Sequence, residues 1–176
     1  MLQISELTSE YIEPLIQYWL TADSNYLFRM GVDLQKMPSE IDWRNMLNEQ
    51  IEASYEMKKA YALIWLFDDK PIGHSNINKI EFGNHAFMHL HSWYSENRNK
   101  NYGYEFMKLC IPQYFEKFNL KTLYCEPKKE NIAPNRMMQK LNFSFVHEYF
   151  GIPGWLNYEQ NVNVWKLDVD TLNNKN

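Results

Sequence analysis

Cysteine is scarce in this sequence. Among 176 residues there are two, Cys110 and Cys125, and neither has a cysteine or histidine neighbour at zinc-ligand spacing. Each falls within an apolar pattern, which is typical of a small core residue rather than of a nucleophile. We therefore expect no metal site and no cysteine-based catalysis.

Long hydrophobic runs and an excess of positive charge are also missing. No stretch reaches the roughly 18 consecutive apolar residues of a membrane span, and residues 1–20 lack a basic start followed by an apolar run. We therefore expect a cytoplasmic protein with no membrane partner. The net charge of −4 argues against nucleic-acid binding, which needs a basic surface. The G-x-x-x-x-G-K-[ST] and G-x-G-x-x-G motifs are absent, which disfavours the common nucleotide-binding domains.

The composition is otherwise that of an ordinary globular protein. Hydrophobic residues make up 45% and charged residues 23% of the chain, and its length suffices for one domain with a sizeable core. No repeat or linker divides the sequence, so we expect a single domain over residues 1–172 and a polar tail over residues 173–176. The aromatic fraction of 16% is high and favours a core, pocket or interface rich in rings.

The hydrophobic pattern alternates between strand and helix periods. Strands are predicted at residues 2–6, 61–67, 71–80, 87–94, 122–126, 143–150 and 162–167. Helices are predicted from residue 8 or 9 to 20, from 40 to 51, over 101–118 and from 131 to 141. Residues 21–38 carry aromatic and turn residues between the first two helices. An antiparallel meander followed by a β-α-β crossover predicts an α+β (mixed α/β) fold, a mostly antiparallel twisted sheet of about seven strands with helices on both faces.

The most informative stretch is WYSENRNKNYGY at residues 93–104. It combines the end of a strand, a short basic loop with one glycine, and the start of an amphipathic helix. A helix that starts on such a loop offers free backbone N–H groups and the positive end of its dipole. This arrangement suits a phosphate or pyrophosphate group.

Two segments carry a resemblance to a known family. Residues 98–104, RNKNYGY, resemble the acetyl-CoA loop R/Q-x-x-G-x-G/A of the GCN5-related N-acetyltransferases (GNAT superfamily), which lies between their fourth strand and third helix. Residues 131–143 are similar to the N-x-x-S/A…K-x-G-F segment of the same family. The order of elements fits as well, and the resemblance covers nearly the whole chain. It is closest to the branch of ribosomal-protein N-terminal acetyltransferases and siderophore-pathway acetyltransferases.

The resemblance implies a GNAT-like fold and acetyl-CoA as co-substrate, without a metal. It implies direct acyl transfer from the thioester to a primary amine of a small molecule or of a protein or peptide N-terminus. A catalytically silent acyl-CoA-binding module is the alternative. The acidic balance of the chain mildly favours a cationic acceptor. The segment 153–158, rich in rings and turn residues, lines the acceptor pocket or mediates a homodimer contact, and the sequence does not choose.

The resemblance also implies which residues hold the co-substrate. Backbone N–H groups of Asn99–Tyr104 are expected to bind the pyrophosphate, with added charge from two basic side chains, and backbone N–H groups near the end of the fourth strand to stabilise the oxyanion. An asparagine at the start of the later helix serves as N-cap and touches the pantetheine or a phosphate-side water. The expected cofactor-binding residues are Trp93, Tyr94, Arg98, Asn99, Lys100, Asn101, Tyr102, Gly103, Tyr104 and Asn131.

Four positions depart from the family pattern. Asn101 and Asn142 stand where the family has glycine, and asparagine tolerates a positive φ better than other non-glycine residues. Pro134 occupies the position of a serine that assists the leaving thiol, and Met138 that of a tyrosine acting as general acid. The chain therefore lacks both usual acids at their matched positions.

The general base is sought among histidines. An amine with a pKa near ~10 is charged at neutral pH and must lose its proton before it attacks. His89 and His91 share a face of the fourth predicted strand and are the candidate catalytic residues; His91 is preferred because it lies nearer the strand end. His74 is a lesser candidate, and Glu126 could act through a water. The alternative is that these histidines are structural and hydrogen-bonded within the sheet.

Overall fold

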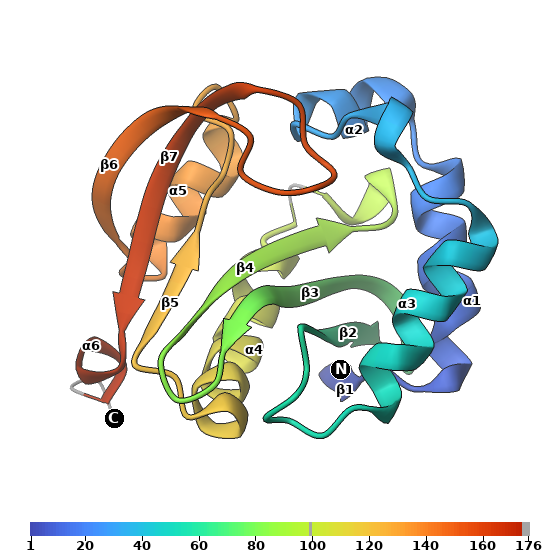
Figure 1. Cartoon of the computed structure of the whole chain (residues 1–176), viewed down its shortest axis with the longest axis horizontal. Helices are drawn as coiled ribbons and strands as arrows, with labels where there is room; N and C mark the ends of the chain where they lie inside the picture. The colour runs from blue at the N-terminus through green and yellow to red at the C-terminus, as the bar shows by residue number, and fades with distance from the viewer. Residues whose placement is uncertain (99, 174–176) are drawn as a thin grey trace.

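The computed structural model describes residues 1–98 and 100–173, so Asn99 and positions 174–176 of the expected tail lie outside it. The described chain forms one seven-stranded sheet in the order β1-β2-β3-β4-β5-β7-β6 (Figure 1). The strands are β1 Leu2–Glu6, β2 Ala60–Phe67, β3 Lys70–Glu81, β4 His85–Ser92, β5 Thr122–Cys125, β6 Ser144–Gly151 and β7 Gln160–Asp168. All seven predicted strands are confirmed, with every boundary within two residues of the prediction.

The helices cover both faces of this sheet. They are α1 Ser9–Thr21, α2 Ser24–Arg29, α3 Glu40–Glu52, α4 Tyr102–Phe118, α5 Ile132–Lys140 and α6 Val169–Asn173, with short 3-10 turns η1 Leu34–Lys36 and η2 Ser95–Asn97. The predicted fold class is confirmed, because every strand pairing is antiparallel except that of β4 with β5. The pattern did not predict α2, η1, η2 or α6.

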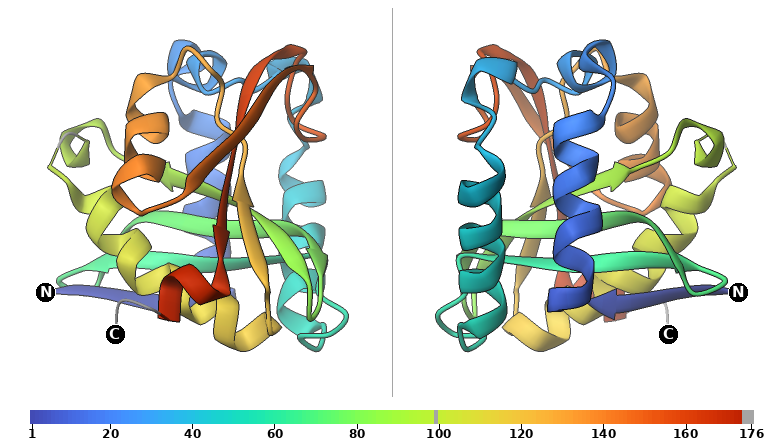
Figure 2. Two further views of the ribbon diagram at one scale, coloured as in Figure 1. Left: turned by 90° about the vertical axis from the view of Figure 1, so that its left-hand side faces the viewer. Right: turned by 90° about the vertical axis from the view of Figure 1, so that its right-hand side faces the viewer.

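Strand alternation divides the core into two layers. Leu63 and Trp65 of β2 face α4 and α5, whereas Ala62 and Ile64 face α1 and α3. The edge-on views show the sheet between these two helical layers, with α2 above one end of it (Figure 2). One layer is thus built around α4, which remains a single helix although Pro112 lies inside it.

The sheet opens in its middle. The parallel strands β4 and β5 pair at only three positions, from His85–Thr122 to Phe87–Tyr124. Beyond that point β4 continues to Ser92 while β5 ends at Cys125, and the two strands diverge (Figure 1). The divergence leaves a gap between the two strands beyond Phe87 and Tyr124.

Candidate active site

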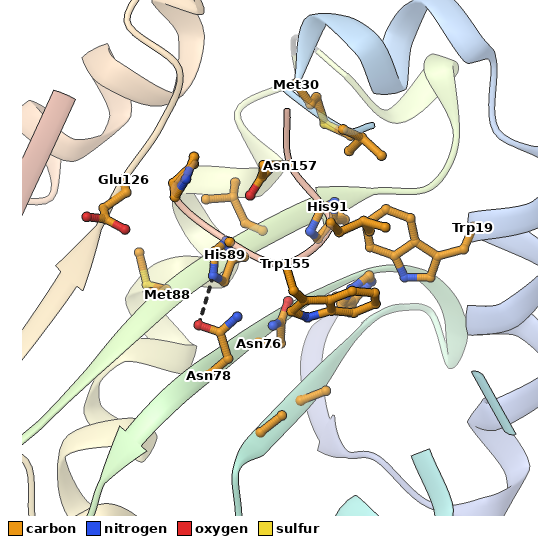
Figure 3. Close-up of a pocket in the computed structure, with 18 of the residues that line it drawn as sticks. Trp19, Met30, Asn76, Asn78, Met88, His89, His91, Glu126, Trp155 and Asn157 are labelled. Carbon is orange, nitrogen blue, oxygen red and sulfur yellow. Dashed lines mark hydrogen bonds between the residues drawn. The ribbon is translucent and has the colours of Figure 1, made fainter. Parts of the chain in front are cut away.

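A cavity of about 260 Å³ occupies this gap and extends over the sheet toward α1 and α3 (Figure 3). It is bounded by the diverging strands, by the start of α5, by two helices and by the connection between β6 and β7. Its lining includes Trp19, Trp43, His74, Asn76, Asn78, Met88, His89, Leu90, His91, Glu126, Lys128, Asn131, Pro134, Trp155 and Asn157.

Polar side chains form a stripe on the floor of the cavity. The β3–β4 register pairs His74 with His91 and Asn76 with His89. Because paired residues of antiparallel strands point to the same face, all four side chains face α1 and α3. The expectation that His89 and His91 share a face is therefore met, and His74 joins them.

His89 lies where the cavity meets the gap. Its Nε2 is 3.1 Å from the Oδ1 of Asn78. An amide oxygen only accepts, so Nε2 carries the hydrogen and Nδ1 is left as an acceptor. Burial, and secondarily the charge of Lys79, lowers the pKa of His89 to about 4. The ring is therefore neutral at physiological pH and offers a lone pair.

His91 and His74 are bound more tightly to their neighbours. The Nδ1 of His91 is 3.2 Å from the hydroxyl of Tyr18, and its ring stacks on that of His74 at 4.7 Å between centroids. The indole Nε1–H of Trp93 donates to the Nδ1 of His74 at 2.8 Å. Burial lowers the pKa of His74 to about 3 and that of His91 well below its ordinary value. Each ring thus has one nitrogen engaged inside the protein.

Glu126 faces His89 from the other side of the gap, just after β5 (Figure 3). Its carboxylate lies 3.4 Å from the Nζ of Lys79 and accepts a hydrogen bond of 3.3 Å from the hydroxyl of Tyr149. Burial, followed by the charge of Glu126, raises the pKa of Tyr149 to about 12. Glu126 is therefore placed as the sequence suggested, with a balancing cation beside it.

The start of α4 has the predicted features of an anion site. Asn101 adopts φ 63°, the left-handed conformation expected of it, and the first intrahelical bond runs from Glu105 N–H to its carbonyl. The N–H groups of Tyr102, Gly103 and Tyr104 therefore precede the first helical acceptor. A Cβ on Gly103 would lie 3.0 Å from the Cε of Met137, so the glycine lets α4 begin close against α5.

Trp93, Tyr94 and Arg98 make contacts other than those expected. The backbone N–H of Trp93 donates to Ile72 O at 3.0 Å and its side chain is buried, while Tyr94 is exposed. The guanidinium of Arg98 stacks over the ring of Tyr26, 3.5 Å from its centroid. Lys100 is exposed at the loop. The charge of Arg98 is thus shared with α2 rather than reserved for the helix start.

The open edge of β4 offers other backbone donors. Trp93 bonds to β3, and bonding residues alternate along a strand. The N–H groups of Leu90 and Ser92 therefore point toward the gap. No strand faces them there, since the described pairing of β4 with β5 ends at Phe87.

Two asparagines lie at the start of α5 and have different contacts. Asn131 lines the cavity at the N-cap position, but its side chain makes no capping hydrogen bond. Asn135, which the sequence did not single out, donates to the carbonyls of Lys128 and Asn131 and accepts from Trp165 Nε1 at 2.9 Å. It ties the start of α5 to β7; its place one helical turn after Asn131 was the available signal.

The remaining positions of the second motif are now located. Pro134 lines the cavity without offering a hydroxyl, whereas Met138 is fully buried in the core. Asn142 adopts φ 65°, as expected of an asparagine in a glycine position. Neither motif position that usually holds an acid therefore supplies one.

Two aromatic segments border the cavity. Trp155 lies 5.9 Å from Trp43 between ring centroids, so the 153–158 segment lines the cavity, while a dimer contact there stays a prediction. In the segment 21–38, Met30 lines the cavity, Phe28 stacks on Tyr158, and the ring of Tyr26 lies under the guanidinium of Arg98.

Comparison with known proteins agrees with this geometry. A sequence profile of the acetyltransferase (GNAT) domain matches residues 2–144. No curated protein matches the chain by sequence. Within the described residues there is no helix long and apolar enough to cross a membrane. Nor do the described residues gather three or more histidine, cysteine or acidic side chains into a potential metal site.

Solved structures share the fold over nearly the whole chain. The ribosomal L7/L12 alpha-N-protein acetyltransferase RimL, in complex with coenzyme A, has a TM-score of 0.77 at 14% identity, covering 97% of this chain and 95% of that one. Spermidine N-acetyltransferase from Vibrio cholerae, with CoA and spermine, has a TM-score of 0.79 at 12% identity, covering 97% and 96%. The microcin C7 self-immunity acetyltransferase MccE, with acetyl-CoA and AMP, has a TM-score of 0.74 at 14% identity, covering 95% and 93%.

The structural similarity shows the fold, and the profile match over residues 2–144 shows the family. The resemblance inferred from two short motifs is confirmed, including a neighbour from the ribosomal-protein branch. The chain therefore belongs to the acetyltransferase (GNAT) family, and its chemistry is the transfer of an acetyl group from acetyl-CoA to an amine.

Proposed function

We propose that the acetyl group is transferred where the gap between β4 and β5 meets the polar stripe at His89. The observation that carries this proposal is the divergence of the two strands after Phe87–Tyr124. Leu90, on the freed part of β4, both lines the cavity and lies beside Gly103 at the start of α4. When bound, acetyl-CoA supplies an activated acetyl thioester. The residues below bind it, orient the amine and take up the proton.

The start of α4 holds the pyrophosphate. Three successive N–H groups, those of Tyr102, Gly103 and Tyr104, combine with the helix dipole, and the exposed Lys100 adds a cation. Gly103 lets this helix start lie close to α5, since a Cβ there would lie 3.0 Å from the Cε of Met137. Arg98 contributes less than the sequence suggested, because its guanidinium stacks on Tyr26.

The open edge of β4 holds the reacting carbonyl. We assign the oxyanion donors to Leu90 and Ser92 rather than to Trp93, whose N–H is already bonded to Ile72. Preorganised N–H donors of this kind are worth about 2.7–4 kcal/mol each when aimed at the developing charge.

His89 is the better of the two candidate bases. Each ring has one nitrogen engaged, but His89 lies two residues beyond Phe87, where β4 and β5 diverge, and faces Glu126, whereas the ring of His91 is stacked on that of His74. Full transfer from an amine of pKa ~10 to a ring of pKa about 4 would cost about 8 kcal/mol. The attacking amine is therefore the fraction that has already lost one proton to water, about 0.1% at pH 7. His89 takes the second proton, from the cationic nitrogen of the tetrahedral adduct, which is far more acidic, and the Glu126 carboxylate across the gap favours the positive charge on the ring.

Loss of the usual acids does not by itself silence the enzyme. A leaving thiol has a pKa near ~8.5, so its thiolate is a stable leaving group that water can protonate. Catalysis thus remains favoured over the alternative of a silent acyl-CoA-binding module, which predicts co-substrate affinity without turnover of any amine.

The test combines calorimetric titration with acetyl-CoA and an amine-panel assay for released CoA. We expect binding, turnover, and a kcat lower by at least about 100-fold in His89→Ala with unchanged acetyl-CoA affinity. His147→Ala, on the exposed β6, is the matched control. Absence of binding at millimolar acetyl-CoA would refute the proposal, and binding without turnover would favour the silent module.

The single domain over residues 1–172, the cytoplasmic location and the homodimer remain predictions from the sequence. All seven described strands belong to one sheet, which is compatible with a single domain.

A further inference from the structure

We propose that the acceptor is an arylalkylamine, a primary amine joined by a short linker to one flat ring that stacks on Trp155. This rests on the proposed function and names the substrate class of the same site. Three observations carry it: the charge of the cavity, the position of one indole, and the size of the space.

The cavity has almost no uncompensated negative charge to receive a polycation. Glu126 is the one carboxylate among its described lining residues, and Lys79 already lies beside it. The cation of Lys128 also lines the cavity and donates to the hydroxyl of Tyr158. Burying a cation without a partner is costly, so a second or third ammonium group on the acceptor is disfavoured. One amine beside Glu126 is the charge that the site can accommodate.

Trp155 is placed to receive a flat ring. All six tryptophans are described; five are at most 7% exposed, whereas Trp155 is 51% exposed on the connection between β6 and β7. Figure 3 shows its indole extending over the cavity between His89 and Trp19. Behind it stand Trp43, 5.9 Å away, and Trp19, which stacks on Trp43 at 5.3 Å. An exposed indole backed by packed rings gains most by covering its free face with another ring.

The space suits a small acceptor. At about 260 Å³ the cavity lies below the roughly 300–1,000 Å³ typical of sites for drug-sized ligands, and part of it is needed for the thioester. An acceptor with a single ring and a two-carbon linker places its ring on Trp155 and its amine toward His89. A long flexible chain would leave the indole uncovered.

The test measures kcat/KM for phenethylamine, 2-cyclohexylethylamine, spermidine and a short peptide with a free N-terminus. The cyclohexyl compound matches phenethylamine in size and charge but lacks the π face. We expect phenethylamine to be preferred at least about tenfold over spermidine and the peptide, and severalfold over the cyclohexyl compound. Trp155→Ala should raise the KM for phenethylamine roughly tenfold with little change in kcat, while Trp155→Phe retains most of the preference.

The control is Phe150→Ala, which removes an exposed ring from β6 outside the cavity and should leave the KM for phenethylamine unchanged. Preference for spermidine or for the peptide, or a Trp155→Ala enzyme with wild-type KM for phenethylamine, would overturn the inference. If acetyl-CoA binds and only aliphatic amines react, this inference fails alone. If acetyl-CoA does not bind, the proposed function fails with it.

Discussion

Acid should destabilise this protein at a pH where most globular proteins remain stable, because its histidine cluster is buried in the neutral form. His74 is 3% exposed, and burial lowers its pKa from 6.5 to about 3. The unfolded chain therefore binds this proton more readily than the folded chain. Above about pH 6.5 the ring of His74 is neutral in both states, so its burial costs no protonation free energy. As the pH falls from 6.5 toward 3, only the unfolded chain binds the proton, and the folded state loses stability. At about pH 5, 1.5 units below the unfolded pKa, the loss is about 2 kcal/mol from His74 alone.

The same reasoning applies to His89, whose pKa falls to about 4, so the cluster should lose about 4 kcal/mol or more by about pH 5. Total stabilities are only about 5–15 kcal/mol, so the effect is measurable by urea unfolding between about pH 7.5 and 5. His74→Asn retains an oxygen that can accept from Trp93 and should flatten the pH dependence by about 2 kcal/mol. His147→Asn, on the exposed face of β6, is the control. Equal pH slopes for wild type and His74→Asn would refute the assignment of a buried neutral ring.

Two further predictions concern single side chains. Asn78→Ala removes the acceptor that orients His89 and should lower kcat about tenfold while leaving the KM for acetyl-CoA unchanged, as steady-state kinetics can establish; a raised KM with an unchanged kcat would instead mean a role in binding. Burial raises the pKa of Cys110 and Cys125 to about 12, so both thiols should be unreactive toward a disulfide reagent in the native protein and titrate only on unfolding. Rapid native labelling of either cysteine would contradict the packing of the core.

Local sequence patterns predicted the elements that are long enough to show a hydrophobic period. The seven strands and the helices α1, α3, α4 and α5 fall in this class. The helix α2 has only six residues, and it is set by the side chain of Asp23, which accepts a hydrogen bond from Tyr26 N–H. A helix this short is too brief to show a 3.6-residue hydrophobic period, so the segment was interpreted from its turn residues instead.

The sequence predicted which residues gather at the candidate site, but not which of their polar atoms are already bonded to other residues of the protein. Strand alternation places His89 and His91 on one face, as the sequence indicates. Strand alternation cannot indicate that the indole N–H of Trp93 donates to His74, or that Arg98 stacks on Tyr26, because these partners are far apart along the chain. Such contacts depend on how α1, α2 and the sheet pack together. The contacts of His91 with Tyr18 and His74 are of the same kind, and they are part of the reason why we propose His89 rather than His91 as the base.

Glycine is used in these motifs for two different reasons, its tolerance of a positive φ and its lack of a side chain, and the asparagines at two glycine positions help to separate them. Asn101 and Asn142 have φ of 63° and 65°, so what these positions require is the left-handed conformation, which asparagine supplies at modest cost. Gly103 differs, because there a Cβ would meet Met137 at 3.0 Å and the requirement is space. Asn101→Gly should therefore leave the Kd for acetyl-CoA within about twofold, and Gly103→Val should raise it at least about tenfold. Calorimetry on both variants, with thermal melts to confirm folding, tests the distinction. Weakened binding in Asn101→Gly with normal binding in Gly103→Val would mean that the asparagine side chain itself contacts the co-substrate and that the helix start does not.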